Sequence, residues 1–166
     1  MRSGIPTPNS VAQQAIIPFI AAAQDAGCRH VVYVSVFGAD RARFIPHDAV
    51  EKALRESMMS STVLRCSFFM QNLHRDLESR CGHHRARRVV RPRRRWAATF
   101  LNARDAAAVA AIALKNPAAH RDTVHHLTEP AALTMGEVAQ VLTTQLGYPV
   151  GLDPVWWTQG QAACAV

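Results

Sequence analysis

A short, continuous apolar run constrains the fold of this chain most. The stretch His30-Val-Val-Tyr-Val-Ser-Val36 has strand length and is rich in β-branched residues. Its hydrophobicity is continuous rather than alternating, which is typical of a parallel strand buried on both faces. Thr62-Val-Leu-Arg-Cys66 has the same character and predicts a second buried strand. Helical segments alternate with such runs, which favours an α/β fold with right-handed crossovers.

The helical segments can be bounded from their caps and periodicity. The first begins at a Ser10 cap and ends near Ala26, where Gly27 supplies a left-handed stop. Proline is tolerated in a first helical turn, so Pro46 predicts a helix that continues to about Glu56. Two more helical patterns cover Phe68–Leu77 and Ala103–Leu114.

The last part of the chain has its own signals. Thr123–Leu127 predicts a short strand, and a further short strand is expected around Val150. Between them, Thr134-Met-Gly-Glu137 is a capping box, in which the threonine hydroxyl and the glutamate carboxylate satisfy free backbone amides. The helix that it opens should end at Gly147.

Composition predicts one globular domain over residues 1–166. Hydrophobic residues make up 49% of the chain and charged residues 19%, which excludes a disordered protein. The formal net charge is +7, but eight arginines lie between Arg80 and Arg95, and without them it becomes −1. The basicity is therefore local and is no general sign of nucleic-acid binding.

Cysteine usage favours a reduced protein of the cytoplasm. The four cysteines include no Cys-x-x-Cys pair. Cys81, His83 and His84 could bind zinc by residue type, but their spacing fits no zinc module, so we expect no metal site. The apolar run Ala15–Ala23 is too short to span a membrane, and we expect no membrane partner.

Five stretches in order resemble the NmrA-like family, a group of atypical short-chain dehydrogenases/reductases. They begin with His30-Val-Val-Tyr-Val-Ser-Val-Phe-Gly-Ala-Asp40 and Pro46-His-Asp-Ala-Val-Glu-Lys-Ala-Leu54. The others are Thr62-Val-Leu-Arg-Cys-Ser-Phe-Phe-Met-Gln-Asn-Leu73, Leu101-Asn-Ala-Arg-Asp-Ala-Ala-Ala-Val109 and Leu127-Thr-Glu-Pro-Ala-Ala-Leu-Thr-Met-Gly-Glu-Val138. The resemblance covers nearly the whole chain except residues 80–97 and the last dozen.

The resemblance implies a Rossmann-type fold that binds NAD(P). We expect a partial parallel sheet with helices on both faces, followed by a small C-terminal substrate-side region. Family members open with a glycine-rich turn that holds the pyrophosphate, yet none of the eight glycines here lies within three residues of another. We therefore interpret the chain as lacking the N-terminal glycine-rich βαβ unit, and expect it to bind NAD(P) weakly.

The resemblance also implies candidate catalytic residues. Ordinary short-chain reductases use a serine at a strand end and a Tyr-x-x-x-Lys helix, in which the lysine lowers the tyrosine pKa. Ser35 occupies the serine place, and counting back four residues from Glu51 puts His47 at the lysine place. Arg43 falls at the tyrosine place, so no phenol is expected there. Ser35 and His47 are the predicted catalytic and cofactor-binding residues; the alternatives are a hydroxyl that fastens a loop and a solvent-facing histidine.

A second set of cofactor contacts follows the second strand. Cys66, Ser67, Phe68 and Phe69 lie at its carboxyl end, the edge where open α/β sheets bind ligands. In relatives this segment lies along the nicotinamide, so we predict cofactor contacts from it. The alternative is that the two phenylalanines fill the core.

The arginine-rich segment 80–97 has three interpretations. Its charge, with Trp96, could bind nucleic acid, or it could be a solvated loop. The third, which we favour, is coding sequence read out of frame. Codons for Pro92-Arg-Arg-Arg-Trp96, read one base later, can give Pro-Ala-Gly-Gly, similar to a turn that relatives carry here. We predict that this segment is poorly ordered and adds no strand to the sheet.

Three functions remain open from the sequence. The first is an atypical NAD(P)H-linked oxidoreductase or its catalytically impaired remnant, acting on an unknown small molecule. The second is a redox-sensing regulator that binds NAD(P) without turnover, and the third is nucleic-acid binding through Arg80–Arg95, which we disfavour. The apolar run Val31–Val36 also predicts self-association through an exposed sheet edge.

Overall fold

The chain folds as two compact units in a computed structural model that describes residues 12–41, 45–73, 88–91 and 97–154. The first unit consists of the described parts of Met1–Cys66 together with Ala106–Leu127. The second consists of the described parts of Ser67–Asp105 and Thr128–Thr158.

A parallel sheet forms the centre of the first unit. Its strands are β1 (His30–Val36), β2 (Ser60–Cys66) and β6 (Thr123–Leu127), in the order β1-β2-β6. The register places Ser35 beside Arg65, so polar side chains of neighbouring strands lie level near the carboxyl ends. The predicted parallel α/β sheet is confirmed.

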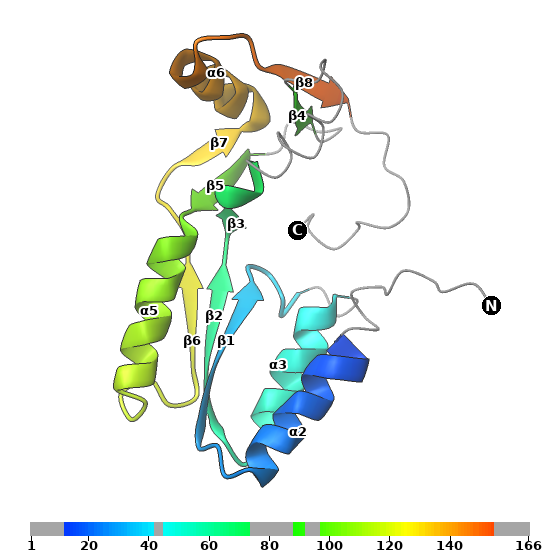
Figure 1. Cartoon of the computed structure of the whole chain (residues 1–166), viewed down its shortest axis with the longest axis vertical. Coiled ribbons are helices and arrows are strands. Elements are labelled where there is room, and N and C mark those ends of the chain that lie inside the picture. Colours follow the sequence, from blue (N-terminus) through cyan, green and yellow to red (C-terminus); the bar gives the residue numbers. More distant parts are fainter. Residues whose placement is uncertain (1–11, 42–44, 74–87, 92–96, 155–166) are drawn as a thin grey trace, which may run out of the picture. The chain divides into compact units, whose positions relative to one another are not determined.

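Helices lie on both sides of this sheet, as predicted. Figure 1 shows α2 (Ile17–Asp25) and α3 (Pro46–Glu56) on one side and the greater part of α5 (Ala103–Lys115) on the other. The predicted bounds of α3 are confirmed, because Ile45 is extended and Pro46 stands in the first turn, where no intrahelical N–H is needed.

The first predicted helix is divided. A π-helical turn, η1 (Ala12–Ile16), precedes α2, and Pro18 stands in the first turn of α2. Proline has no N–H to donate to the fourth residue before it, which accounts for a change of helix type at this point. Gly27 has φ 81° and is the predicted left-handed stop. The predicted Ser10 cap lies outside the described residues.

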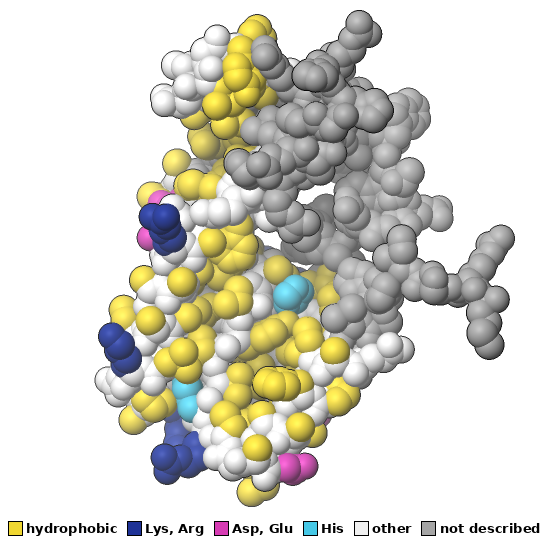
Figure 2. Space-filling view, in the orientation of Figure 1, with side chains coloured by type: hydrophobic (Ala, Val, Ile, Leu, Met, Phe, Trp, Pro, Cys, Tyr) yellow, Lys and Arg dark blue, Asp and Glu magenta, His cyan; other side chains and the backbone are white. Residues whose placement is uncertain are grey.

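The two apolar strands differ in burial. Strand β2 is buried from Ser61 to Cys66, as predicted. The prediction that β1 is buried on both faces is wrong, because within β1 only Ser35 is buried and Val34 is 44% exposed. Among the described strands β1 pairs with β2 alone, so it is an edge strand. Figure 2 shows hydrophobic side chains spread over the surface of the lower part of the view, where this unit lies.

The second unit contains a mixed three-stranded sheet. Strand β5 (Ala97–Leu101) pairs in parallel with β3 (Phe68–Phe69) and antiparallel with β7 (Ala132–Thr134). The prediction of a helix from Phe68 is wrong for its first residues. Phe68 pairs with Phe100 in the sheet, and helical residues begin only at Gln71.

Helix α6 (Met135–Leu146) carries the clearest local signals of this unit. The Thr134 Oγ1 accepts from the Glu137 N–H at 3.3 Å, and the Glu137 carboxylate accepts from the Thr134 N–H at 2.7 Å. Gly147 ends the helix with φ 70°. The predicted capping box and stop are confirmed, and buried Met135 and Val138 pack with Phe100 in the core of the unit.

The arginine-rich segment forms one short strand. Strand β4 (Arg88–Arg91) pairs in parallel with β8 (Gly151–Pro154), which is also the short strand predicted around Val150. The prediction that this segment adds no strand is wrong for these four residues. The N–H and C=O groups that pair with β8 belong to the backbone, so an arginine-rich sequence can form this ladder too. Neither three-stranded sheet includes β4. Residues 80–87 and 92–96 lie outside the described part of the chain.

Candidate functional site

A buried polar cluster joins β1, β2 and α3 in the first unit. The Ser35 hydroxyl donates to Glu51 Oε1 at 2.6 Å. The Arg65 guanidinium donates to the same carboxylate from Nε at 3.2 Å and from Nη2 at 2.7 Å. Glu51 is 1% exposed and Arg65 is 7% exposed. A buried carboxylate is stable only when it is paired and hydrogen-bonded, and this one is both.

The electrostatics of this cluster favour an ionised Glu51. Burial opposes ionisation, but the hydrogen bonds from Arg65 and Ser35 and the nearby positive charges outweigh it, so the Glu51 pKa is lowered. The hydrogen bonds that Arg65 donates to Glu51 raise the Arg65 pKa. Arg65 also pairs with Asp40, in the turn after β1, at 3.2 Å. The pairs hold β2 against both the turn after β1 and α3.

A phenol and an imidazole pair next to this cluster. Strand alternation places Tyr33 on the same face of β1 as Ser35, and helical spacing places His47 one turn before Glu51. The Tyr33 hydroxyl lies 2.8 Å from His47 Nδ1, and the two ring centroids are 5.9 Å apart. Which atom donates depends on the histidine tautomer.

Burial shifts the pKa of each member of the pair in the direction that favours its neutral form. Burial, with the nearby Glu51 carboxylate, raises the pKa of Tyr33 to about 12, so the phenol keeps its proton at neutral pH. Burial lowers the pKa of His47, although the Glu51 charge acts in the opposite direction. At neutral pH the pair therefore consists of a neutral phenol and a largely neutral imidazole, with a carboxylate close enough to stabilise an imidazolium.

The sequence prediction found part of this arrangement. Ser35 and His47 both lie in it, but the structure joins each to another partner: Ser35 to Glu51 and His47 to Tyr33. Arg43, at the predicted tyrosine place, lies outside the described residues. The phenol that reaches His47 comes from the strand rather than the helix, and Tyr33 was missed. Its position two residues before Ser35 on one strand face was the available signal.

Cys66 is the last residue of β2 and belongs to the same unit. Its thiol is buried and lies 3.6 Å from the Leu64 carbonyl oxygen. Burial raises the pKa of Cys66 to about 11, so the thiol stays protonated and is a poor nucleophile at neutral pH.

The remaining predicted cofactor contacts lie in the second unit. Ser67 Oγ is the one buried side-chain oxygen or nitrogen without a hydrogen-bond partner in the described part of the chain. Phe68 packs edge-to-face on Phe100, with ring centroids 5.4 Å apart, and so contributes to the core, as the alternative interpretation proposed. Phe69 pairs with Leu101 and is half-buried.

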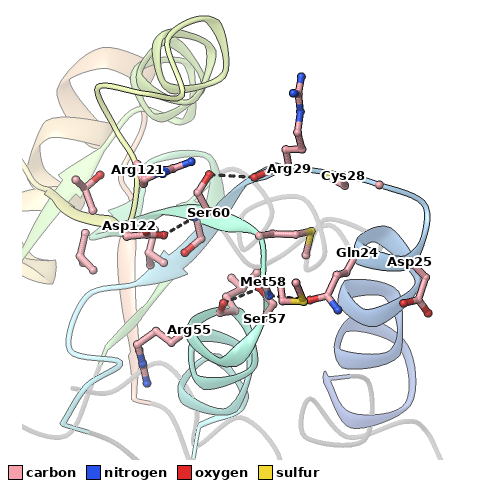
Figure 3. A pocket seen from close by; sticks show the side chains of 17 residues that line it. Gln24, Asp25, Cys28, Arg29, Arg55, Ser57, Met58, Ser60, Arg121 and Asp122 are labelled. Carbon is pink, nitrogen blue, oxygen red and sulfur yellow. Dashed lines mark hydrogen bonds between the residues drawn. The ribbon is translucent and has the colours of Figure 1, made fainter.

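A hollow of about 810 Å³ lies at the opposite end of the first sheet. Figure 3 shows it between Arg29, Ser60 and Arg121, which stand at or just before the amino ends of β1, β2 and β6. The Ser60 hydroxyl donates to the Arg29 carbonyl oxygen at 3.0 Å. Open parallel sheets bind ligands beyond the carboxyl ends of their strands, so this hollow is not the candidate site despite its size.

The sequence predicts neither a metal site nor a membrane-spanning segment, and both predictions can be compared with the described residues. Within them, no group of three or more His, Cys, Asp or Glu side chains is placed to hold a metal ion. Cys81, His83 and His84 lie outside this part of the chain. No helix in the described ranges is long and apolar enough to cross a membrane.

Comparison with known proteins gives the family. The sequence model of the NmrA-like family matches residues 7–155. This chain belongs to the NmrA-like family. The match covers both units, in agreement with the five stretches identified in the sequence.

Relatives of this NmrA-like chain include named reductases. It is 32% identical over 162 residues to an NAD(P)H azoreductase from Xenophilus azovorans, an alignment that covers 94% of the chain and 54% of the azoreductase. An NADPH-dependent quinone oxidoreductase from Escherichia coli, solved with NADPH, has a TM-score of 0.68 at 26% identity and is matched over 84% of the chain and 49% of the oxidoreductase.

A third similarity supports the fold alone. The triphenylmethane reductase of Citrobacter sp., solved with NADP(H), has a TM-score of 0.66 at 24% identity, over 90% of the chain and 54% of that reductase. The NmrA-like chain thus spans about half the length of the relatives it matches. These structures are Rossmann-type reductases, which agrees with the predicted fold class.

Proposed function

We propose that this NmrA-like chain forms the substrate-side part of an NAD(P)H-dependent reductase. The observation that carries the proposal is the Tyr33–His47 pair next to the buried Ser35–Glu51–Arg65 cluster. It lies toward the carboxyl ends of parallel strands, where such sheets bind ligands. Relatives named as an NAD(P)H azoreductase and an NADPH-dependent quinone oxidoreductase support azo or quinone compounds as the substrate class.

His47 is the proposed proton donor. A bound NAD(P)H would supply hydride to the substrate. The His47 imidazolium then releases the proton on Nε2 to the reduced substrate, and the electron pair of that N–H bond stays on the ring. Nδ1–H meanwhile donates to the Tyr33 oxygen, which fixes the ring orientation. Because burial lowers the pKa of His47, its imidazolium is a stronger acid than a histidine in water.

Ser35 acts on this pair through another residue. Ser35 is 1% exposed and its hydroxyl donates a hydrogen bond to Glu51, so we propose a positioning role. Glu51 in turn favours the charged form of His47. For the second unit we propose that the Ser67 hydroxyl, which has no hydrogen-bond partner among the described residues, is the cofactor contact of the segment that includes Cys66, Phe68 and Phe69.

The alternative is a redox-sensing regulator that binds NAD(P) without turnover. The observation that favours it comes from the sequence, where Arg43 and His47 stand at the tyrosine and lysine places of the ordinary proton relay. Both functions require dinucleotide binding. We expect that binding to be weak, since the sequence contains no glycine-rich turn to hold the pyrophosphate.

One set of measurements separates these functions. NADPH is titrated into the chain by calorimetry, and its oxidation with an azo dye or a quinone is followed by loss of nicotinamide absorbance. The reductase proposal predicts a rate that rises as pH falls toward the His47 pKa and falls about a hundredfold in His47→Gln. Lys52→Gln, an exposed change on the same helix, should leave the rate unchanged.

The outcomes decide between the proposals. NADPH binding without oxidation of the cofactor would favour the regulator. A rate that is equal in His47→Gln and the unmodified chain would remove His47 as the proton donor. The absence of any NADPH binding would overturn both functions for this chain.

A further inference from the structure

Two histidine rings converge away from the candidate reductase site. His120 lies in the turn between α5 and β6, and His125 lies within β6. Nδ1 of His120 is 3.3 Å from Nε2 of His125, and the rings stand edge-to-face with centroids 5.4 Å apart. We infer that these two nitrogens form a chelating site for a divalent transition-metal ion, with zinc as the best geometric match.

The spacing of the two nitrogens fits a metal chelate. Histidine binds zinc at about 2.0–2.1 Å, so two imidazole nitrogens on one tetrahedral ion stand roughly 3.3–3.4 Å apart. The observed separation of 3.3 Å falls at that value. Imidazole is also a good ligand for copper and nickel, but a square-planar ion would bring the nitrogens closer, to roughly 2.9 Å.

The backbone of the turn holds this spacing. The His120 carbonyl oxygen accepts two hydroxyl hydrogen bonds, from Thr62 Oγ1 and from Thr123 Oγ1, each at 2.8 Å. Asp122 has φ 54° and is the one non-glycine residue with positive φ among those described. Its carboxylate accepts from the Ser61 N–H at 3.0 Å, which fastens the turn to β2. These contacts fix the backbone that carries the two ligands, so metal binding requires the rings to turn until both lone pairs face one ion.

Other histidines of the same unit differ from this pair. Both ring nitrogens of His30 are hydrogen-bonded to hydroxyls, at 2.8 Å to Ser60 and 3.2 Å to Thr62. His126 points to the other side of β6, where its ring packs on Phe37 at 5.5 Å. Neither ring is placed to join the chelate, and His126 provides a matched control.

Two imidazoles give an open site rather than a closed structural one. In the described ranges no third His, Cys, Asp or Glu completes a cluster, so water would fill the other positions on the ion. Without metal, one ring donates to the other, and Thr123 Oγ1 lies 3.2 Å from the same His125 nitrogen. Metal binding replaces that hydrogen bond, because the proton of the donating nitrogen moves to the other nitrogen of the same ring. We expect an exchangeable ion.

Zinc titration of the whole chain tests the inference. The background is a Cys81→Ser/His83→Gln/His84→Gln variant, because those three residues are a second possible source of zinc ligands. In this background we expect one Zn²⁺ per chain by calorimetry. His120→Gln and His125→Gln should each weaken binding by at least about tenfold. His126→Gln should not change it.

A second measurement needs no substitution in the pair. Addition of Zn²⁺ to the unmodified chain should shift the ring NMR signals of His120 and His125 and leave those of His126 in place. Zinc binding that persists at full strength in both single variants would overturn the inference. So would ring signals of His120 and His125 that do not respond to Zn²⁺. Because NADPH oxidation does not enter either measurement, the result is independent of the proposed function.

Discussion

The Ser35 hydroxyl donates a 2.6 Å hydrogen bond to Glu51 Oε1, and this bond joins β1 to α3 inside the first unit. Hydrogen bonds from Arg65, which approaches from β2, and from Ser35 lower the pKa of this carboxylate despite its burial. Three elements of the first unit therefore depend on one buried charge pair, and the energetic consequences of that dependence can be measured.

Removal of Arg65 should destabilise the chain strongly. Arg65→Met leaves the Glu51 carboxylate buried without its main partner, which we expect to cost about 3–5 kcal/mol in the free energy of unfolding by urea. Adding Glu51→Gln to Arg65→Met should recover part of that loss, because the uncompensated charge is gone. Lys52→Ala removes an exposed pair at 3.8 Å and should change stability by less than about 0.5 kcal/mol. Equal losses in Arg65→Met and Lys52→Ala would contradict the buried network.

The phenol of Tyr33 should ionise late. The chain contains two tyrosines, so Tyr148→Phe leaves Tyr33 as the sole source of tyrosinate absorbance. We expect that absorbance to appear with a pKa of about 12 in the folded chain and to return to the ordinary 10.0 in denaturant. Titration at the ordinary value in folded protein would show that the phenol is not buried against His47.

Stability should fall in two stages as the solution is acidified. The His47 pKa is lowered from 6.5 in the folded chain, so the unfolded chain binds that proton first, and stability is lost as pH falls below about 6.5. The lowered Glu51 pKa adds a second loss as pH falls below 4.5. Chemical unfolding measured from pH 7 to about pH 3 should show both stages. His47→Gln should abolish the upper stage alone; an unchanged profile in this variant would contradict the assignment.

Replacement by alanine should have opposite effects on stability at Gly136, inside α6, and at Gly147, the residue that ends it. Gly147 has φ 70°, so Gly147→Ala should destabilise by roughly 1–2 kcal/mol even though nothing lies within 4 Å of the added carbon. Gly136 is helical, and the nearest atom to an added carbon is Thr134 Oγ1 at 3.7 Å. Gly136→Ala should stabilise by roughly 0.5 kcal/mol. Thermal unfolding of both variants checks the signs, and a stabilising Gly147→Ala would refute the left-handed cap.

The exposed edge of β1 should control self-association. Within the described strands β1 has a partner on one side only, and its Val34 side chain is 44% exposed. Val34→Lys should therefore change the sedimentation behaviour of the chain more than Val141→Lys, which alters a 53% exposed valine of α6. A stable monomer for the unmodified chain in analytical ultracentrifugation would count against association through this edge.

Local signals predicted the elements that local interactions determine. The bounds of β1 and α3 and the capping box of Thr134 and Glu137 follow from strand composition, proline and hydroxyl chemistry. The short strands β6 and β8 were predicted, whereas β3, β4, β5 and β7 were missed because pairing with a neighbouring strand defines them. Phe68–Phe69 has a helical pattern, yet its position beside β5 makes it a strand.

The sequence predicted individual residues of the candidate site but not the partners that they contact. Ser35 and His47 came from the family pattern, but their partners depend on how β1 packs against α3. Tyr33 and His47 are fourteen residues apart, and nothing within either segment specifies that a phenol will meet an imidazole. Arg65 interrupts an apolar run, and a charge in a buried strand needs a partner carboxylate. This was the strongest signal that the sequence prediction did not use.

The order of the strands has a consequence for how the chain is made. Strand β6 completes the first sheet, but the ribosome synthesises it only after Ser67–Asp105 of the second unit. Of the described strands of the first sheet, a nascent chain that ends near Cys66 holds β1 and β2, and the β6 side of β2 has no described strand to pair with. Translation therefore leaves an interval in which β2, the most buried strand of the finished sheet, is an open edge, and chaperone binding during that interval would suppress misassembly.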